Sequence, residues 1–581
     1  MRHRNVRHLA LAAILATLGG MVAAPNAAVG QGNPGTVLYL WAGDAGQGPV
    51  LQNGKDYSTP DNDDFLAVVD ADPNSPEYGK VRKTVSVPTG GPGNEPHHMQ
   101  PFTPPGCKTV FGGGLFSDFW YQFDISDPLN PKRAGTLTPG HTQGAVPDAA
   151  FLLPNCEALG TEMGGDPSTG SYVGGPHGTV IRMNPTGSEV LETQMADRDQ
   201  DRACNEQWVP SGTTNKPGGD FTRKTNVNDC LPSNPHGIWG RPDLNELVTS
   251  DYATPGRLIQ AEAPTADVAK LTVRHYHLDP ACTGKNPSPK GADCMKNPRV
   301  VLLPDGPRGE ANEGHKENVG IMETALTNGP DEFNPEGKTP EGYLPSKGGF
   351  ATSMCGGALF YTPDVTAEAP SWKEVFDYTT AGQAAKPGLP STAGCSGGGG
   401  VAVTADNRFV VHTIIGRDPG QAGNFVASST NPAGFPGMVV KLDVSKLIQA
   451  GADPNCSIDT GDEVWTGGKD PDCPKLAAVH VVDDASTGGP HFFSYDYGNN
   501  TERLAFFNYF VSETGVGGDL RVCMLMTKDL SVDTRFPASV DGQHPGSGCI
   551  SFRRGNWPGE RGANAGPAKP HYGLFANVGG G

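Results

Sequence analysis

Several histidines of this chain directly follow proline, in places spread along the whole sequence. They are His97, with His98 beside it, His177, His236, His491 and His571. Neutral imidazole nitrogens bind copper, iron and zinc, so histidines that converge in the folded chain could form a transition-metal site. A simpler interpretation is that Pro-His only begins a β-strand, with each ring bonded to a neighbouring carbonyl group. Recurrence in separate units makes the metal site an equally good interpretation for His97/His98, His236, His491 and His571.

Other residues could take part in the same chemistry. His141 and His412 lie on possible inner elements and are further candidate ligands. Glu162, Glu317 and Glu323 are candidate carboxylates that could support a ligand or move a proton, although most glutamates on loops are simply solvated. Of these three, Glu323 is the predicted catalytic residue.

The sequence offers little support for other chemistry. His275 and His277 alternate along a predicted strand and are interpreted as ordinary strand residues. The chain contains neither a Gly-x-Ser-x-Gly motif nor a Walker loop. The run of glycines at 397–400 is not followed by a lysine or a helix, so it does not indicate a phosphate site.

The elements that would position the histidines recur along the chain. A short apolar or alternating strand, often ending in an acidic residue, occurs seven times at spacings of about 55 to 95 residues. The seven segments are 66–70, 120–124, 179–183, 274–279, 359–364, 438–443 and 520–526. Between them lies a second hairpin, which opens at Pro235 and Pro490 in two of its copies.

Two hairpins per unit make a four-stranded sheet, and the radial repetition of such sheets makes a β-propeller. The sequence therefore predicts an all-β, seven-bladed β-propeller that occupies residues 31–581 as a single domain. Several β-sandwiches in tandem are the alternative, but they do not explain the recurring order of the two hairpins. The inner strands of a propeller run along its central channel, so the Pro-His segments would converge there.

The composition agrees with a turn-rich β protein. Of 581 residues, 80 are glycine and 53 are proline, while only 18% are charged and 36% are hydrophobic. Long helical bundles and coiled coils need few helix breakers and many charged residues, so they are excluded. The formal net charge of -19 opposes a general affinity for nucleic acid.

The N-terminus has the features of a secretory signal. Arg2, Arg4 and Arg7 precede an apolar stretch over 9–24, and small residues follow it. A membrane anchor is the weaker interpretation, because the apolar run is short and contains a glycine pair. We expect a signal peptide over residues 1–30, and a secreted or periplasmic protein that is not inserted in a membrane once the signal is removed.

Twelve cysteines agree with export, because an even number suits an oxidising compartment. No two form a Cys-x-x-Cys motif, so a zinc ribbon or a thioredoxin-type site has no support. Three close pairs lie in polar loops and favour disulfides that hold long insertions, although connectivity does not follow from sequence alone. These pairs are Cys204/Cys230, Cys282/Cys294 and Cys456/Cys473.

Parts of the chain resemble the selenium-binding protein and methanethiol oxidase family. Residues 65–81 (FLAVVDADPNSPEYGKV) are similar to its first blade, and Asn94-Glu-Pro-His-His98 is similar to its paired-histidine segment. Residues 121–131 are similar to the strand and turn before the next motif histidine, here His141. Similarity in order and pattern continues through 347–360, 488–491 and 569–571.

The resemblance implies a seven-bladed propeller and, for the oxidase members, a copper site built from histidines. It also implies oxidation of methanethiol, a small sulfur-containing substrate, by O2 to formaldehyde, hydrogen sulfide and hydrogen peroxide. Carried onto the matching positions, it implies copper ligands at His97, His98, His141, His491 and His571.

Two departures from the family pattern stand out. Gly79 occupies the position of a reactive cysteine in vertebrate members, which puts selenium binding there in doubt, and the usual C-terminal ending is replaced by Tyr572-Gly-Leu-Phe575. Two alternatives to an oxidoreductase therefore stay open: a non-catalytic propeller that binds a ligand or a protein partner, and a lactonase-like hydrolase that depends on a divalent cation.

Overall fold

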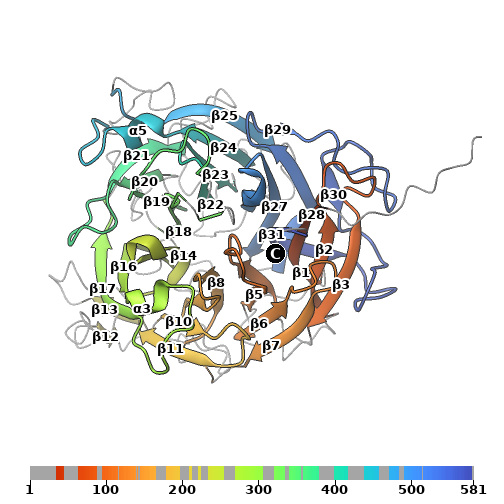
Figure 1. The fold of residues 1–581 in the computed structure, drawn as a ribbon, viewed down its shortest axis with the longest axis horizontal. Helices are drawn as coiled ribbons and strands as arrows, with labels where there is room; N and C mark the ends of the chain where they lie inside the picture. Colours follow the sequence, from red (N-terminus) through yellow and green to blue (C-terminus); the bar gives the residue numbers. More distant parts are fainter. Residues whose placement is uncertain are drawn as a thin grey trace, which may run out of the picture. The chain divides into compact units, whose positions relative to one another are not determined.

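Seven β-sheets surround a common centre (Figure 1), and each contains at least four strands. This arrangement confirms the predicted seven-bladed β-propeller. In the computed structural model, the described residues are 35–44, 63–87, 94–115, 117–138, 141, 144–164, 178–195, 208–211, 220–223, 233–253, 269–304, 320–330, 332–333, 339–354, 358–378, 398–415, 437–456, 470–482, 490–512 and 515–578.

The innermost strand of each blade contacts the innermost strands of both neighbouring blades, so these strands form a closed ring. They are β4 (Pro96–Met99), β8 (Pro147–Leu152), β14 (Pro235–Arg241), β18 (Ile321–Leu326), β22 (Gly398–Val403), β26 (Pro490–Tyr495) and β31 (Ala568–Asn577). The second strands are β5 (Thr109–Gly114), β9 (Ala158–Glu162), β15 (Glu246–Ala253), β19 (Gly349–Ser353), β23 (Phe409–Ile414), β27 (Arg503–Ser512) and β1 (Thr36–Asp44).

The seven recurring segments identified in the sequence all fall on the third strand of a blade. These strands are β6 (Phe119–Asp124), β10 (Thr179–Met183), β16 (Ala269–Leu278), β20 (Ala358–Thr362), β24 (Gly437–Asp443), β28 (Gly515–Met526) and β2 (Asp64–Asp70). The recurrence was informative because the third strand, packed between two others, has a similar environment in every blade.

Six blades end in a single outer strand, and β28 pairs instead with two short strands, β29 (Ser531–Val532) and β30 (Cys549–Ser551). The other outer strands are β7 (Lys132–Leu137), β11 (Val190–Met195), β17 (Met295–Leu302), β21 (Lys373–Asp377), β25 (Lys475–Val482) and β3 (Val81–Val87). A separate hairpin joins β12 (Trp208–Ser211) to β13 (Asp220–Arg223). Short helices within the described residues are η2 (Pro242–Leu244), α3 (Pro280–Thr283), α5 (Ser445–Gln449) and η4 (Tyr497–Asn499).

The ring closes by pairing the two ends of the chain. Strand β31 joins β1 in antiparallel register, from Thr36 opposite Asn577 to Asp44 opposite Ala568. The last blade in space therefore combines three strands from the start of the chain with one from its end, and β31 is the innermost of the four. This pairing closes the ring of blades, because it joins the two ends of the chain within one four-stranded sheet.

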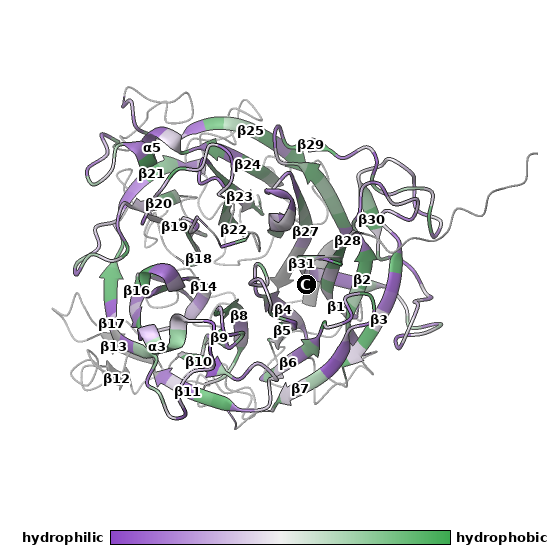
Figure 2. Cartoon of the chain, viewed as in Figure 1, coloured by the Kyte–Doolittle hydropathy of each residue, from purple (hydrophilic) through white to green (hydrophobic). Residues whose placement is uncertain are grey.

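The apolar core lies between neighbouring blades. All residues of β2 are buried, whereas the outer strand β7 is exposed over its first half. Figure 2 shows hydrophobic residues concentrated on strands such as β28 and hydrophilic residues in the connecting loops. The indole of Trp41 packs on Gly112 of the next blade so closely that a Cβ there would lie 3.1 Å from the ring. The same contact recurs one blade further on, between Trp120 and Gly160.

Four disulfides occur among the described residues. Two are the predicted loop pairs, Cys282–Cys294 and Cys456–Cys473. The sequence did not predict the other two, Cys107–Cys156 and Cys523–Cys549. The predicted pair Cys204/Cys230 lies outside the described residues. None of the helices within the described ranges is long and apolar enough to cross a membrane.

Candidate metal centre

The candidate metal centre lies where the inner strands begin. Strands β4, β14 and β26 each open on proline followed by histidine, and β8 opens in the same way on Pro147 and Asp148. Residues from six blades come together here and are called the axial cluster: His97, His98, Asp148, His236, Glu323, His491 and His571.

Irregular strand pairing positions these side chains. The register between the inner strand and the second strand shifts between Pro96 and Met99, so His97 and His98 have no opposite residue in β5. The same irregularity leaves Asp148, His236, His491 and His571 outside the regular pairing of their blades. A bulge changes the direction in which side chains point. Proline has no N–H to donate to the neighbouring strand, and next to a bulge, where the pairing is already interrupted, this costs no hydrogen bond. Six of the seven residues in the axial cluster therefore occupy bulged positions.

Asp148 is the common partner of three histidines. Its Oδ1 lies 2.8 Å from Nδ1 of His97 and 3.0 Å from Nδ1 of His98. Its Oδ2 lies 3.2 Å from Nε2 of His236, whose Nδ1 is 3.0 Å from Oε1 of Glu323. His97, His98, Asp148 and His236 can each turn one ligand atom to within 4.8 Å of the others.

A second group shares His98 and adds His491 and His571. One ligand atom of each lies within 4.8 Å of the others. Nδ1 of His571 donates a hydrogen bond of 2.6 Å to the Pro96 carbonyl oxygen. A neutral imidazole carries one proton, so this bond leaves Nε2 of His571 unprotonated. That Nε2 lies 3.1 Å from Nδ1 of His491. The hydrogen bond to the Pro96 carbonyl oxygen thus fixes the orientation of the His571 ring, in the way that a hydrogen bond to the other ring nitrogen usually orients a metal-ligating histidine.

Several buried polar atoms of the axial cluster have no hydrogen-bond partner among the described residues. They are both ring nitrogens of His98, Oδ2 of Asp148, Nδ1 of His236 and Oε1 of Glu323. Some lie 3.0–3.6 Å from one another but without the angles of a hydrogen bond. Buried polar atoms are normally partnered. A cation bound between them would satisfy this requirement, so the donor set fits a transition metal.

The electrostatics of the axial cluster favour neutral histidines. Burial lowers the pKa of His98 to about 3. Burial and the neighbouring histidines also hold the pKa values of His491 and His571 well below the usual range. His236 differs, because Asp148 and Glu323 outweigh its burial and raise its pKa. Most rings therefore have an unprotonated nitrogen at neutral pH, which metal binding needs.

The two carboxyl groups of the axial cluster have opposite character. Burial alone would raise the pKa of Asp148, but His236, His97 and His98 outweigh it and lower that pKa well below the ordinary value. Burial raises the pKa of Glu323 to about 7, against the opposing effect of His236. Asp148 is therefore a permanent anion, whereas Glu323 can gain or lose a proton near neutral pH.

A small cavity adjoins the axial cluster. Its volume is about 20 Å³, and His98, Glu323, Phe492 and Tyr572 are among its lining residues. This space holds one water-sized molecule. Trp239 and Tyr497 line it too. A ligand of a metal held by His98 would thus meet an apolar, enclosed surrounding.

The structure brings together most of the residues singled out in the sequence. His97, His98, His491 and His571 meet in the axial cluster, and His236 joins them. His141 is exposed, with Nδ1 2.8 Å from the Thr138 hydroxyl, and it lies outside both groups. His412 is buried on β23 with its ring centre 4.2 Å from that of Tyr378, and it also lies outside both groups.

Of the carboxylate candidates from the sequence, one lies in the axial cluster and another does not. Glu323 lies in the axial cluster, whereas Glu162 accepts hydrogen bonds from Trp120 and Thr179 and supports strand packing. Glu317 and His177 lie outside the described residues. Asp148 was missed by sequence reasoning, although Pro147-Asp148 follows the Pro-His pattern with an acidic residue in place of histidine.

No family model matches the chain, but comparison with individual proteins finds similarities in sequence and in fold. The chain is 34% identical over 130 residues to a methanethiol oxidase of Hyphomicrobium sp, a match that covers 22% of this chain and 29% of that protein. It is 25% identical over 227 residues to a methanethiol oxidase of Rattus norvegicus, covering 37% and 40% respectively. A solved structure of a hypothetical selenium-binding protein from Sulfolobus tokodaii superposes with a TM-score of 0.52 and 12% identity, over 95% of this chain and 96% of that one.

The matched segments span less than half of the length of either methanethiol oxidase. The superposition extends over nearly the whole of both chains, and at its low identity it bears on the fold. Sequence and fold together confirm the resemblance noted in the sequence.

Proposed function

We propose, on the premise that this chain is similar to the selenium-binding protein and methanethiol oxidase family, that it is an exported copper-dependent oxidoreductase. Its substrate would be a small thiol, oxidised by O2. The observation that carries the proposal is the axial cluster, in which five buried histidines and Asp148 turn ligand atoms toward one another.

The donor set supports copper as the metal. His97, His98, His236, His491 and His571 offer imidazole nitrogens, which suit copper better than they suit magnesium or calcium. When bound, copper would supply the redox chemistry, since it binds soft sulfur ligands and exchanges single electrons with O2. Asp148 would hold three of the rings in position and offset the positive charge of the ion.

Glu323 is the proposed proton acceptor. A thiol binds a metal as thiolate, so its proton must leave on binding. Glu323 is among the residues that line the small cavity, and burial raises the pKa of its carboxyl group to about 7, so it can accept that proton. The neighbouring ring of His236, 3.0 Å away, offers the next position for the proton.

The small cavity supports a small substrate. A volume of only about 20 Å³ beside His98 disfavours a large thiol. Oxidation of methanethiol consumes O2 and one water and gives formaldehyde, hydrogen sulfide and hydrogen peroxide. The apolar walls, which include Phe492 and Tyr572, would keep bulk water from the reacting sulfur.

Export is also part of the proposal. Four disulfides among the described residues support an oxidising compartment, whether secreted or periplasmic. We propose that residues 1–30 act as a signal peptide and that 31–581 form the single mature domain.

Metal analysis combined with oxygen uptake tests the proposed function. The copper-loaded protein should hold about one copper per chain and consume O2 with methanethiol. His97→Ala and His571→Ala should lose both properties, while the matched variant His277→Ala, on an exposed histidine, should keep them. A wild-type chain that stays metal-free after copper loading would sink the proposal. Calcium bound in place of copper would favour the hydrolase, and bound copper without oxygen uptake the non-catalytic propeller.

A further inference from the structure

A second and much larger cavity lies at the opposite ends of the inner strands. Its volume is about 510 Å³, within the range of ordinary ligand pockets. Phe102 follows β4, Phe151 lies near the end of β8, and Pro242 follows β14, so the cavity opens where these strands end and not where the histidines begin them. None of its lining residues lines the small cavity beside His98.

An aromatic partition separates the two cavities. Phe102 and Phe151 line the large cavity, whereas Trp239 and Tyr497 line the small one. The ring of Phe102 lies 6.0 Å from that of Trp239 and 5.7 Å from that of Tyr497, measured between ring centres. The large cavity is therefore a separate compartment with an aromatic floor.

One oxygen of a carboxylate in the wall of the large cavity has no hydrogen-bond partner among the described residues. Oε2 of Glu332 accepts a hydrogen bond of 2.9 Å from the Gly329 amide, but Oε1 is buried and no described residue donates to it. The nearby cation Arg241 is already engaged, because both oxygens of Asp243 lie 2.7 Å from its guanidinium. Arg241 also donates to the Ser346 carbonyl oxygen. Arg241 thus attracts Glu332 electrostatically, but its hydrogen bonds go to other residues, such as Asp243 and Ser346, and not to Glu332.

We propose that this cavity binds a small organic cation, with an ammonium group on Glu332 and an apolar body against Phe102 and Phe151. A cation is attracted both by a carboxylate and by the faces of aromatic rings. Among the described residues that line the cavity, the one cation is Lys285, which is exposed and can keep its ammonium in water. The net charge of -19 also favours the approach of cations.

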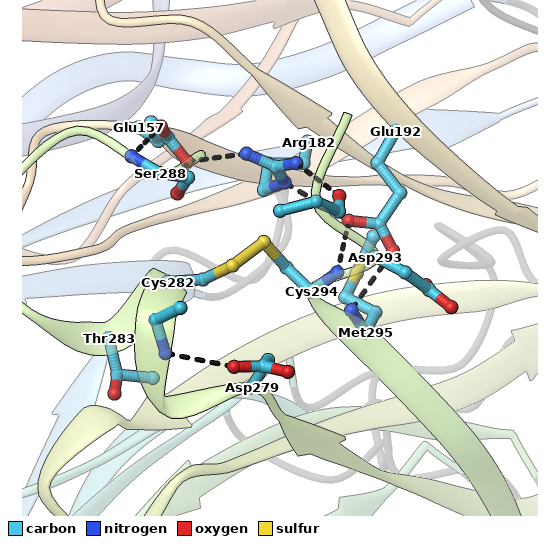
Figure 3. Close-up of a disulfide and its surroundings, with 12 residues drawn as sticks. Glu157, Arg182, Glu192, Asp279, Cys282, Thr283, Ser288, Asp293, Cys294 and Met295 are labelled. Carbon is cyan, nitrogen blue, oxygen red and sulfur yellow. Dashed lines mark hydrogen bonds and ion pairs between the residues drawn. A yellow bond between two sulfur atoms is a disulfide. The ribbon is translucent and has the colours of Figure 1, made fainter. Parts of the chain in front are cut away.

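One wall of the cavity is preformed by a disulfide-held loop. Thr283 and Lys285 belong to the segment that joins β16 to β17, and Cys282–Cys294 closes it. Figure 3 shows how this loop is fastened to the neighbouring blade: Glu192 accepts from the Cys294 amide at 2.9 Å, and Glu157 accepts from Ser288 at 2.7 Å. Because this wall is already ordered before a ligand binds, binding does not have to include the entropy cost of ordering it.

Calorimetric titration with two probes of equal size tests the proposal. At pH 8 benzylamine is a cation and benzyl alcohol is neutral, so we expect benzylamine to bind at least tenfold more tightly. Glu332→Gln should reduce the affinity for benzylamine at least tenfold and leave that for benzyl alcohol unchanged. Glu368→Gln, on an exposed glutamate far along the chain, is the matched control and should behave as the wild type.

A second variant keeps the test decisive if Glu332→Gln does not fold. Lys285→Glu changes an exposed residue at the wall and should tighten benzylamine binding several-fold, because it replaces a repelling charge by an attracting one. Copper content should be the same in all variants, which separates this site from the axial cluster. Equal affinity for the two probes, or a benzylamine affinity that neither variant changes, would overturn the proposal.

Discussion

Asp148 is the residue on which the axial cluster depends most. It is fully buried, and its two oxygens contact three histidines from two other blades. A buried anion in such a place stabilises whichever cation the rings hold, and without a cation it draws a proton onto His236, whose pKa it raises. The carboxylate therefore sets both the orientation and the charge of the group.

Asp148→Asn should lower the affinity for copper by about 10- to 100-fold, the usual effect of losing a carboxylate that supports metal ligands. The amide keeps the size of the side chain but loses its charge. Copper titration against a competing chelator measures the change, with the surface variant Asp453→Asn as control. Unchanged copper affinity in Asp148→Asn would remove Asp148 from the site.

Glu332 gives a prediction on stability and pH. Burial raises its pKa from 4.5 to about 7, against the opposing effect of Arg241. The unfolded chain thus loses this proton first, so the carboxyl group destabilises the fold increasingly as pH rises from about 4.5 to 7. Glu332→Gln removes this pH-dependent decrease in the free energy of unfolding. Its free energy of unfolding, relative to the wild type, should rise by up to about 2–3 kcal/mol between pH 5 and pH 8.

Urea unfolding of both proteins at the two pH values measures this difference directly. All other ionisable groups are shared, so their contributions cancel when the two curves are subtracted. A difference that does not change with pH would mean that Glu332 titrates normally in the folded protein.

At the scale of single residues, the sequence predicted the histidines of the axial cluster better than its carboxylates. Pro-His is a visible pattern, and His97, His98, His236, His491 and His571 all reach the axial cluster. Asp148 carries the same signal, Pro followed by a ligating residue, but acidic residues after proline are common in turns and do not stand out. His141 was proposed from its place on a possible inner element and from the family resemblance, but here it lies in an exposed turn beside Thr138.

At the scale of elements, the inner strands are the parts that carry chemistry. Their pairing with the second strand is irregular at the first residues, which is where the ligand candidates lie. The third strands could be predicted because their pattern repeats. The bulges could not, because they depend on how a strand pairs with its neighbour and leave no distinct pattern in the sequence.

The loop closed by Cys282–Cys294 gives a prediction at the same scale. Replacing both cysteines by serine should weaken benzylamine binding at least threefold, because the wall that contains Thr283 and Lys285 loses its crosslink. Stability should fall by about 2–4 kcal/mol. Copper content should not change, since the axial cluster draws no residue from this loop. Cys456→Ser with Cys473→Ser, on another loop, is the matched control for the binding measurement.

An unaltered benzylamine affinity in the Cys282/Cys294 variant would show that the contacts of Glu157 and Glu192 hold the wall without the crosslink. The double variant of the other loop should lose stability but retain benzylamine binding. Comparing the two pairs thus separates the loss of a crosslink in general from the loss of this wall.

At the scale of the whole molecule, β31 has two functions. It closes the ring by pairing with β1, and it carries His571 into the axial cluster. A chain ending at Pro567 should therefore lose cooperative thermal unfolding and aggregate, because the innermost position of a blade is left empty. His571→Ala should cost only about 0.5–3 kcal/mol and unfold cooperatively. Calorimetry and gel filtration distinguish the two, and a monomeric truncated chain with the melting temperature of the wild type would contradict the role of β31.

The order in which the ligands occur along the chain has a consequence for how the protein matures. His97 and His571 lie far apart in the sequence, with His97 well before His571, yet their rings meet at 4.4 Å between ring centres. The full set of candidate ligands therefore exists only once β31 has paired with β1. A metal that needs the full set would be bound only after the ring has closed, so we expect the compartment in which the ring closes to determine which ion is available to the protein.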